Sequence, residues 1–144
     1  MTSLLDVNLL IALFWSAHEA HRKAQRWFAQ NAQHGWATCV TTQAAFVRIV
    51  SNPVFSRRGV SPRDALAVLG SSLEHPAHRF WTEDIDVPEA LAICLPRLIG
   101  HQQVTDAYLL GLAIHKKGRL ATLDASLSSL LPEESAAHRH VLSI

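Results

Sequence analysis

Three aspartates stand where two predicted strands and one predicted helix would place side chains at a common edge. Asp6 follows the apolar run at residues 3–5, and Asp124 follows the largely apolar run at residues 120–123. Runs that are apolar on both faces are typical of strands buried in a parallel sheet. In an open parallel sheet the ligand site lies beyond the carboxyl ends of the strands, so both aspartates are expected there. Asp106 begins an apolar helical segment whose N-terminus can face the same edge.

Three carboxylates at one edge would repel one another. At a separation of ~5 Å and an effective dielectric constant of ~20, each pair costs about 3 kcal/mol, so a cation must offset the repulsion. Ligands that offer only oxygen favour Mg²⁺ or Mn²⁺ over zinc. A water made more acidic by such a metal is a nucleophile for phosphodiester hydrolysis. The trio therefore predicts a metal-dependent enzyme that hydrolyses phosphodiester bonds.

Each aspartate also has a purely structural interpretation. Asp6 could cap the first helix, and Asp124 could cap a short helix that begins at Ala125. Asp106 could simply complement the dipole of a helix capped by Thr105. The choice stays open at this point, because the convergence of the three side chains in space is inferred.

The rest of the chain alternates strands with helices. Strands are expected at residues 3–5, 36–40, 79–81, 120–123 and 138–144. Helices are expected at residues 7–15, 19–31, 88–99 and 106–117, from Thr41 or Thr42 to a stop at Asn52-Pro53, and after Ser61-Pro62. This alternation predicts an α/β fold, a three-layer α/β/α sandwich with a mostly parallel sheet.

Composition narrows the class of protein. The chain has 144 residues, 49% hydrophobic and 17% charged, which predicts one domain over residues 1–144 with a buried core and excludes wholesale disorder. The apolar run at residues 8–15 follows no Lys or Arg and is far shorter than the ~20 residues that span a bilayer. Cys39 and Cys94 have no metal-ligand spacing and are interpreted as buried thiols in a reducing compartment. A cytoplasmic location is expected.

The basic residues are unevenly distributed. The net charge is +1, but the stretch between Glu19 and Asp64 holds seven Lys or Arg and no acidic residue. Most are Arg, whose planar fork suits phosphate, so this region is expected to meet nucleic acid or phosphate. The alternatives are a solvated positive surface and a contact with an acidic protein. His18 and His21 have a possible metal-ligand spacing but lack further ligands, so they are interpreted as a solvated loop pair.

Four motifs follow one another along nearly the whole chain. They are Leu4-Leu5-Asp6-Val7-Asn8, Thr41 to Arg48 with Ser51-Asn52-Pro53, Val104 to Leu109, and Ala121-Thr122-Leu123-Asp124. Together they resemble the PIN domain and, more narrowly, the VapC-type ribonuclease toxins of bacterial type II toxin–antitoxin pairs. The Thr-Asp-Ala-Tyr run and the closing Thr-Leu-Asp are fairly specific, whereas the first motif alone is not.

The resemblance implies a PIN-like fold with a parallel sheet between helices and an acidic cluster that binds Mg²⁺ or Mn²⁺. It implies an endoribonuclease that acts on RNA, commonly as a homodimer, with a small antitoxin protein as the partner that blocks the site. By this resemblance Asp6, Asp106 and Asp124 carry over as catalytic metal ligands. Asn8 and Thr105 carry over as supporting polar residues near the cluster.

One position departs from the family pattern. The family usually has a glutamate on the helix after the second strand, where this chain has Gln43. An amide can offer oxygen to a metal or a donor to phosphate, but it brings no charge and cannot act as a base. Weaker metal binding, or a single well-occupied metal, is therefore expected rather than loss of activity. Arg48 on the same helix, and Arg57 and Arg58 in the following loop, are expected to contact RNA phosphates.

Two other classes of protein fit part of the pattern. Aspartyl-phosphate enzymes and receiver domains also place aspartates at strand ends, but the first kind needs Asp-x-Asp where this chain has Asp6-Val7-Asn8. The second kind needs an acidic pair after the first strand and a lysine after a late strand, and neither is evident. A PIN-like module that only binds RNA or a protein is the remaining alternative, and Gln43 is its best support.

Overall fold

The computed structural model, which describes all 144 residues, has a five-stranded sheet in which every neighbouring pair of strands is parallel. In sheet order the strands are β3 (His78–Phe80), β2 (Trp36–Thr38), β1 (Ser3–Leu5), β4 (Arg119–Thr122) and β5 (Val141–Ser143). The strand that leads into Asp6 is thus the central one, with a parallel neighbour on each side. The predicted parallel sheet is confirmed.

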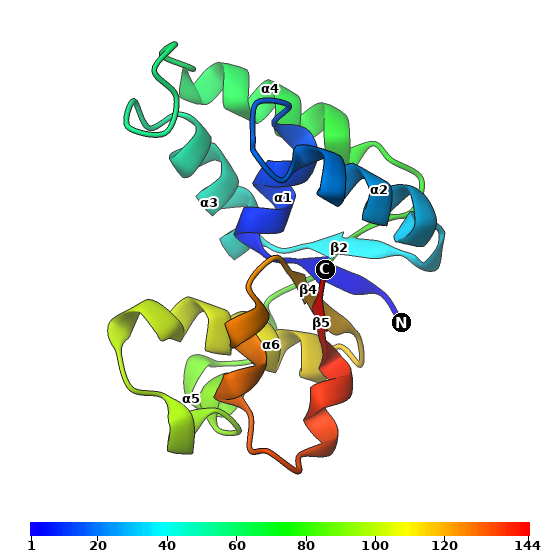
Figure 1. Cartoon of the computed structure of the whole chain (residues 1–144), viewed down its shortest axis with the longest axis vertical. Helices are drawn as coiled ribbons and strands as arrows, with labels where there is room; N and C mark the ends of the chain where they lie inside the picture. Colours follow the sequence, from blue (N-terminus) through cyan, green and yellow to red (C-terminus); the bar gives the residue numbers. More distant parts are fainter.

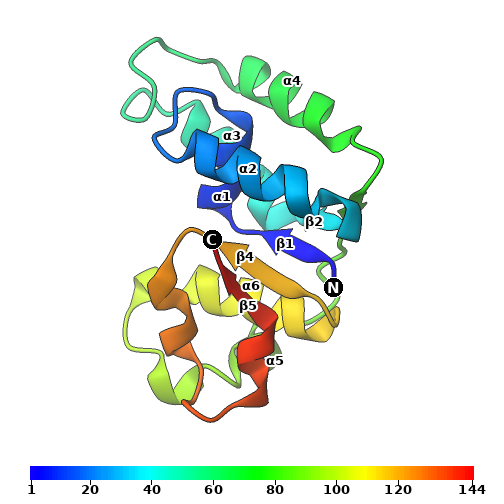
Figure 2. The ribbon, with the colours of Figure 1, turned by 45° about the vertical axis from the view of Figure 1, so that its right-hand side comes forward.

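Helices cover both faces of the sheet (Figure 1). One layer holds α1 (Val7–Phe14), α2 (His21–Asn31), α3 (Val40–Val50) and α4 (Pro62–Leu73), and the other holds α5 (Val87–Leu91) and α6 (Val104–His115). Figure 2 shows the same two layers on either side of the strands in a rotated view. The expected three-layer α/β/α sandwich is therefore confirmed. No helix combines the length and the apolar character needed to cross a bilayer.

Alternating side chains along the strands build two cores. Leu4 and Leu120 pack with α5 and α6, whereas Leu5 and Ala121 pack with the layer of α1 to α4. All four are 0% exposed, because successive strand residues point to opposite faces and helices cover both faces. The double burial explains the continuous apolar runs in the sequence. It leaves the carboxyl ends of the strands as the place where polar side chains emerge.

The start of α3 differs from the sequence prediction. α3 begins at Val40, so neither Thr41 nor Thr42 is its N-cap, and the N-cap is Cys39. The Thr42 hydroxyl accepts from the Cys39 N–H at 3.0 Å, the reciprocal half of a capping box. Thr42 therefore stabilises the helix start from inside the first turn. Both cysteines are free and buried, as expected.

Three later boundaries also differ. The helix expected at residues 88–99 ends at Leu91 and is followed by a 3₁₀ turn at Leu95–Arg97, because Pro96 has no N–H to continue the helix. α6 begins after a 3₁₀ turn at His101–Gln103, so Thr105 lies inside the helix and does not cap it. The last strand is shorter than expected, because residues Ala136–His140 form another 3₁₀ turn.

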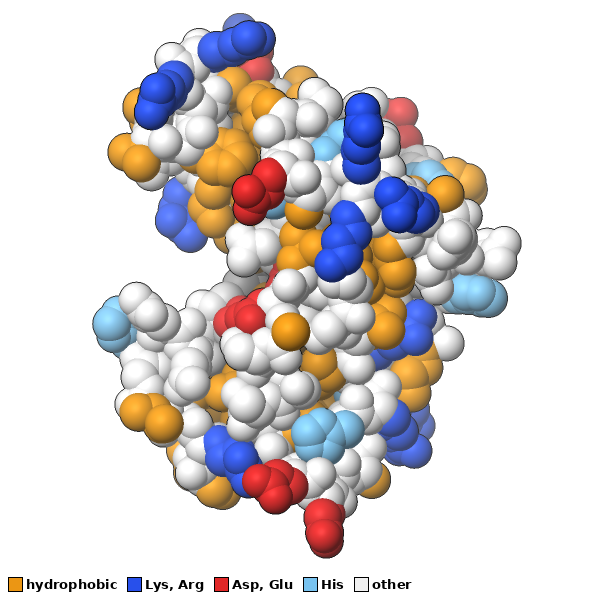
Figure 3. All heavy atoms as spheres, in the orientation of Figure 1, with side chains coloured by type: hydrophobic (Ala, Val, Ile, Leu, Met, Phe, Trp, Pro, Cys, Tyr) orange, Lys and Arg blue, Asp and Glu red, His pale blue; other side chains and the backbone are white.

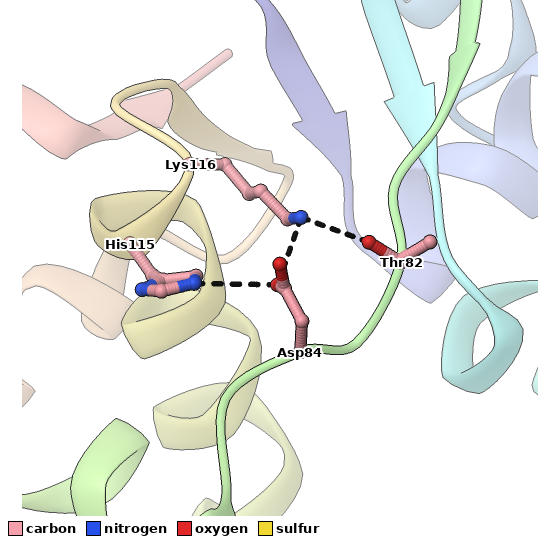
Figure 4. Close-up of polar contacts among 4 residues, drawn as sticks. All are labelled: Thr82, Asp84, His115 and Lys116. Atoms are coloured by element: carbon pink, nitrogen blue, oxygen red, sulfur yellow. Dashed lines mark hydrogen bonds and ion pairs between the residues drawn. The ribbon is translucent and has the colours of Figure 1, made fainter.

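The connection after β3 is held against both α6 and α3. Asp84 accepts from Lys116 Nζ at 2.8 Å and from His115 Nε2 at 3.2 Å, at the C-terminal end of α6 (Figure 4). One residue away, Glu83 accepts from the Thr41 N–H in the first turn of α3 at 2.7 Å. These contacts fix the start of α3 relative to α6, on which two of the candidate site residues lie.

Gly111 lets α5 and α6 approach closely. A Cβ atom at this position would lie 2.0 Å from the carbonyl oxygen of Ala90. Gly70, in α4, has nothing within 4 Å of the corresponding position. A methyl group at Gly111 would therefore clash with the backbone of α5, whereas a methyl group at Gly70 would meet no other atom.

Substitution of each glycine by alanine should have opposite effects. Gly111→Ala should lower the free energy of unfolding by about 1–3 kcal/mol or more, because backbone must move to admit the methyl group. Gly70→Ala should raise it by up to about 1 kcal/mol through better helix propensity. Urea denaturation of both variants measures this, and equal stability of Gly111→Ala and the parent would contradict the close packing of α5 on α6.

Candidate active site

The fold brings the three predicted aspartates to one end of the sheet. Asp6 directly follows β1 and Asp124 lies two residues after β4, and the two strands are neighbours with Leu5 opposite Ala121. Asp106 lies in the first turn of α6. The charges of Asp106 and Asp124 each raise the pKa of Asp6, so all three lie within electrostatic reach. Figure 3 shows a hollow between the two helical layers, with acidic side chains on its inner wall.

Asp6 is the most enclosed of the three, with 4% of its surface exposed. One carboxylate oxygen accepts from the Leu9 N–H at 2.8 Å and caps α1, so the capping interpretation is confirmed. The other oxygen accepts from the Thr122 hydroxyl at the end of β4. That hydroxyl also accepts from the Asp124 N–H at 2.9 Å. Thr122 therefore joins the Asp6 side chain to the Asp124 backbone.

None of the three carboxylates of this cluster is paired in a salt bridge. Burial raises the pKa of Asp6 to about 6; hydrogen bonds from Thr122 and Leu9 oppose this rise, and the charges of Asp106 and Asp124 add to it. Burial and the charge of Asp124 also raise the pKa of Asp106. A cation at this edge would relieve the repulsion among the three carboxylates.

The donor set suits a hard divalent cation. The three side chains offer only oxygen, the ligand type that Mg²⁺ and Mn²⁺ prefer. As the side chains stand, no three His, Cys, Asp or Glu residues are arranged to hold a metal ion. Asp124 Oδ1 instead accepts from the N–H and hydroxyl of Ser126, at 2.9 and 2.7 Å, and caps the 3₁₀ turn Ala125–Leu130. Metal binding would therefore need rotation of the half-exposed Asp106 or the exposed Asp124 toward Asp6.

Two cavities meet at Asp124. One, of about 260 Å³, is lined by Asp106 and Asp124 together with amide and hydroxyl side chains such as Gln102 and Ser129. The other, of about 490 Å³, places Asn8 beside Asp124. Asn8 therefore lines a cavity next to the acidic cluster, and this cavity shares Asp124 with the cavity that contains Asp106.

Neither Gln43 nor Thr105 forms a hydrogen bond with any of the three aspartates. The Gln43 amide nitrogen donates to the Thr38 hydroxyl at 2.9 Å, at the end of β2, and that hydroxyl lies 2.8 Å from His78 Nε2. Thr105 is exposed and lines a cavity of about 530 Å³ that contains Glu83 and none of the three aspartates. Consecutive helical residues point about 100° apart, which explains how Asp106 faces the cluster while Thr105 faces elsewhere.

The predicted basic contacts lie in the layer of α1 to α4. Arg48 is exposed in the last turn of α3. Arg57 and Arg58 are exposed in the loop between α3 and α4, where they line a cavity of about 840 Å³. Trp15 and Phe55 line the same cavity, with ring centroids 6.4 Å apart. This surface combines guanidinium groups with partly exposed aromatic faces.

Several residues of the site carry no distinctive signal in the sequence. Thr122 belongs to the closing Thr-Leu-Asp motif, but the sequence does not show that its hydroxyl bonds Asp6. His18, Glu19 and Lys23 are brought beside Asp124 by the path of the α1–α2 connection, which no local pattern predicts. Spacing alone does not separate these residues from ordinary surface positions.

Comparison with known proteins identifies the family. Residues 3–130 match the sequence profile of the PIN domain. The chain belongs to the PIN-domain family. It is 42% identical over 128 residues to Ribonuclease VapC39 of Mycobacterium tuberculosis, covering 89% of this chain and 92% of that protein. This similarity places it with the VapC-type members.

Two further PIN-domain relatives match over the full length. Ribonuclease VapC38 of Mycobacterium tuberculosis is 38% identical, covering 99% of each chain, and Ribonuclease VapC44 is 35% identical, covering 100% of each. The crystal structure of VapBC2 from Rickettsia felis bound to a DNA fragment from their promoter superposes with a TM-score of 0.66. It is 12% identical and covers 92% of this chain and 94% of that one. At that identity the likeness shows the PIN fold alone.

The raised pKa of Asp6 predicts how stability depends on pH. The folded protein keeps a proton that the unfolded chain, with the ordinary carboxyl pKa of 3.8, has already released. The contribution of Asp6 to the free energy of unfolding should therefore fall as the pH rises from about 4 to about 6, and then level off. In Asp6→Asn this fall should disappear, and stability at pH 7 without metal should rise by on the order of 2 kcal/mol.

Urea denaturation of parent and Asp6→Asn in EDTA from pH 4 to pH 8 measures the effect. The amide oxygen can still accept from the Leu9 N–H, so the cap of α1 is retained. Parallel pH profiles for the two proteins would contradict a raised pKa for Asp6.

Proposed function

We propose that this PIN-domain protein is an Mg²⁺- or Mn²⁺-dependent endoribonuclease that hydrolyses RNA phosphodiester bonds as the toxin of a bacterial type II toxin–antitoxin pair. The observation that carries the proposal is the convergence of Asp6, Asp106 and Asp124 at the carboxyl end of a parallel sheet, with no salt bridge to any of them. Full-length similarity to proteins named as VapC ribonucleases supports it.

The protein's own groups have distinct tasks in this reaction. A bound Mg²⁺ or Mn²⁺ would supply Lewis acidity and an acidified water. Asp6 is held rigidly by the Leu9 N–H and the Thr122 hydroxyl, so it would act as the fixed ligand. Asp106 and Asp124 are more exposed and would turn to complete the set. Above a pH of about 6 Asp6 is ionised, which makes all three carboxylates available.

The partners belong to the same proposal. VapC-type membership favours an antitoxin protein that covers the acidic edge, a homodimer and a cytoplasmic location, and the VapBC2 structure of the same fold supports the antitoxin. Gln43, on α3 and bonded to Thr38 at the end of β2, keeps its proposed supporting role, and Asn8 keeps its role beside Asp124. Thr105 has less support, since it lines a cavity without the aspartates.

A non-catalytic PIN module that only binds RNA or a protein is the second candidate. Gln43 favours it, because an amide bonded to Thr38 brings no charge to the cluster. The two candidates share the fold and the basic surface. They differ in whether bound RNA is cut when a divalent metal is added.

Cleavage of single-stranded RNA distinguishes the two candidates. The parent should cut RNA in millimolar Mg²⁺ or Mn²⁺ and not in EDTA, and Asp106→Asn should lower the rate roughly 100-fold or more. Mg²⁺ should also raise the melting temperature of the parent and raise that of Asp106→Asn less. Asp64→Asn, in the exposed first turn of α4, is the matched control and should cut normally. Retention of RNA without cutting would support the binding module instead.

The basic surface makes a separate prediction about affinity. Alanine at both Arg57 and Arg58 should weaken binding of single-stranded RNA and reduce the slope of log K against log salt by about 1.4, since each lost phosphate contact removes about 0.7. Fluorescence anisotropy at several salt concentrations in EDTA measures both. The charge-matched control is Arg79→Ala with Arg97→Ala, outside the acid-free stretch. An unchanged slope for the Arg57/Arg58 variant would assign that surface to another task.

A further inference from the structure

The cavity of about 490 Å³ beside Asp124 has a composition that the metal site does not explain. Its lining includes Asn8, His18, Glu19, Lys23 and Asp124. It shares Asp124 with the cavity that contains Asp106. A strand of RNA that placed one phosphate at the acidic cluster would therefore lead its neighbouring nucleotide into this second cavity. The volume lies within the range of cavities that hold small ligands.

His18 offers a hydrogen-bond donor to this cavity. Its Nδ1 accepts from the Ala20 N–H at 3.0 Å, so in the neutral ring the proton must be on Nε2. His21, three residues on, is fixed differently, with Nδ1 2.8 Å from the Ala12 carbonyl oxygen, and it lines the larger cavity of Trp15. The solvated-pair interpretation is therefore wrong. Both rings are half-buried, bonded to backbone and directed to different cavities.

Lys23 supplies the positive charge of the same wall. It is exposed in the first turn of α2 and takes part in no salt bridge of the structure. The cavity is thus lined by an ammonium group without a salt-bridge partner, a ring N–H and the Asn8 amide, which are three kinds of donor to an anion. Phosphodiester oxygens are acceptors only, so this set suits a phosphate group.

Two carboxylates line this cavity and oppose an anion, and Glu19 is the one outside the proposed metal site. Its carboxylate is exposed and lines the cavity together with Lys23. A phosphate bound there would be repelled by Glu19, whereas a cation bound there would be attracted by it. Whether removal of the Glu19 charge strengthens or weakens binding therefore reports whether the natural occupant is an anion or a cation.

We propose that this cavity is a phosphate subsite for the RNA nucleotide adjacent to the cleaved bond, with Lys23 and the His18 Nε2–H as its binding groups. The inference deepens the proposed ribonuclease function and rests on it. Lys23 and His18 would determine how the strand lies across the acidic edge, so that a neighbouring phosphate meets Asp6, Asp106 and Asp124. They are positioning residues for cleavage and binding residues for the RNA.

Binding of a fluorescein-labelled single-stranded RNA to the full chain in EDTA tests the subsite without requiring cleavage. Lys23→Ala should raise Kd about 3- to 10-fold and lower the salt slope by about 0.7. Arg22→Ala, the adjacent exposed cation that does not line the cavity, should change Kd less than about twofold. Lys23→Arg should restore binding. His18→Ala should weaken it, and His18→Gln, whose amide N–H can replace the Nε2–H donor, should weaken it less.

Glu19→Gln gives the opposite sign and so excludes a general loss of folding. It should tighten RNA binding about 2- to 5-fold, because a repelling charge is removed. If Glu19→Gln instead leaves RNA binding unchanged and weakens binding of Mn²⁺, the cavity holds a cation and the proposal is overturned.

A set of oligonucleotides, each with one neutral methylphosphonate linkage, locates the contact. At one linkage, the losses of binding free energy caused by the methylphosphonate and by Lys23→Ala should not be additive. The losses caused by the methylphosphonate and by Arg22→Ala should be additive at every linkage. Additive losses at all linkages for Lys23→Ala would contradict the proposed subsite. If the protein cleaves RNA in Mg²⁺ but shows no such coupling, the subsite proposal is wrong and the nuclease proposal stands. If it shows the coupling but does not cleave RNA, the nuclease proposal is wrong and the subsite stands.

Discussion

The burial of the Asp6 carboxylate is the constraint around which the acidic edge of this PIN domain is arranged. A nearly enclosed carboxylate is costly unless its oxygens have donors, and here they are met by the Leu9 N–H and the Thr122 hydroxyl. Those two donors come from the start of α1 and the end of β4, so the side chain joins the central strand to its neighbour. The capping and site interpretations of Asp6 are therefore two aspects of one arrangement.

The same arrangement keeps the site charged. Hydrogen bonds favour the ionised form of Asp6, but burial and the nearby Asp106 and Asp124 outweigh them. The protein thus holds like charges together at the expense of its own stability, which is common where a site must bind a cation. Asp106 and Asp124 are more exposed than Asp6, so the cluster combines one fixed carboxylate with two that have room to turn.

The α1–α2 connection is the element that links this edge to the basic layer. On one side it carries Trp15 and His21 into the cavity of Arg57 and Arg58. On the other it carries His18 and, through the start of α2, Lys23 into the cavity beside Asp124. A polyanion that follows the cationic groups would reach the carboxylates. There its phosphate would be repelled unless a cation were bound between them.

Much of this molecule could be foreseen from its order of residues, because apolar runs that end on Asp6 and Asp124 obey local rules of strand burial and parallel sheets. Element ends were less predictable, since the start of α3 and the break at Pro96 depend on which cap or missing N–H prevails. Local pattern could not show that Asp106 faces the cluster while its neighbour Thr105 faces another cavity, because that depends on how α6 is rotated against the sheet. The bond from Thr122 to Asp6 spans 116 positions, and the tautomer of His18 depends on a loop, so both were decided by packing of the folded chain.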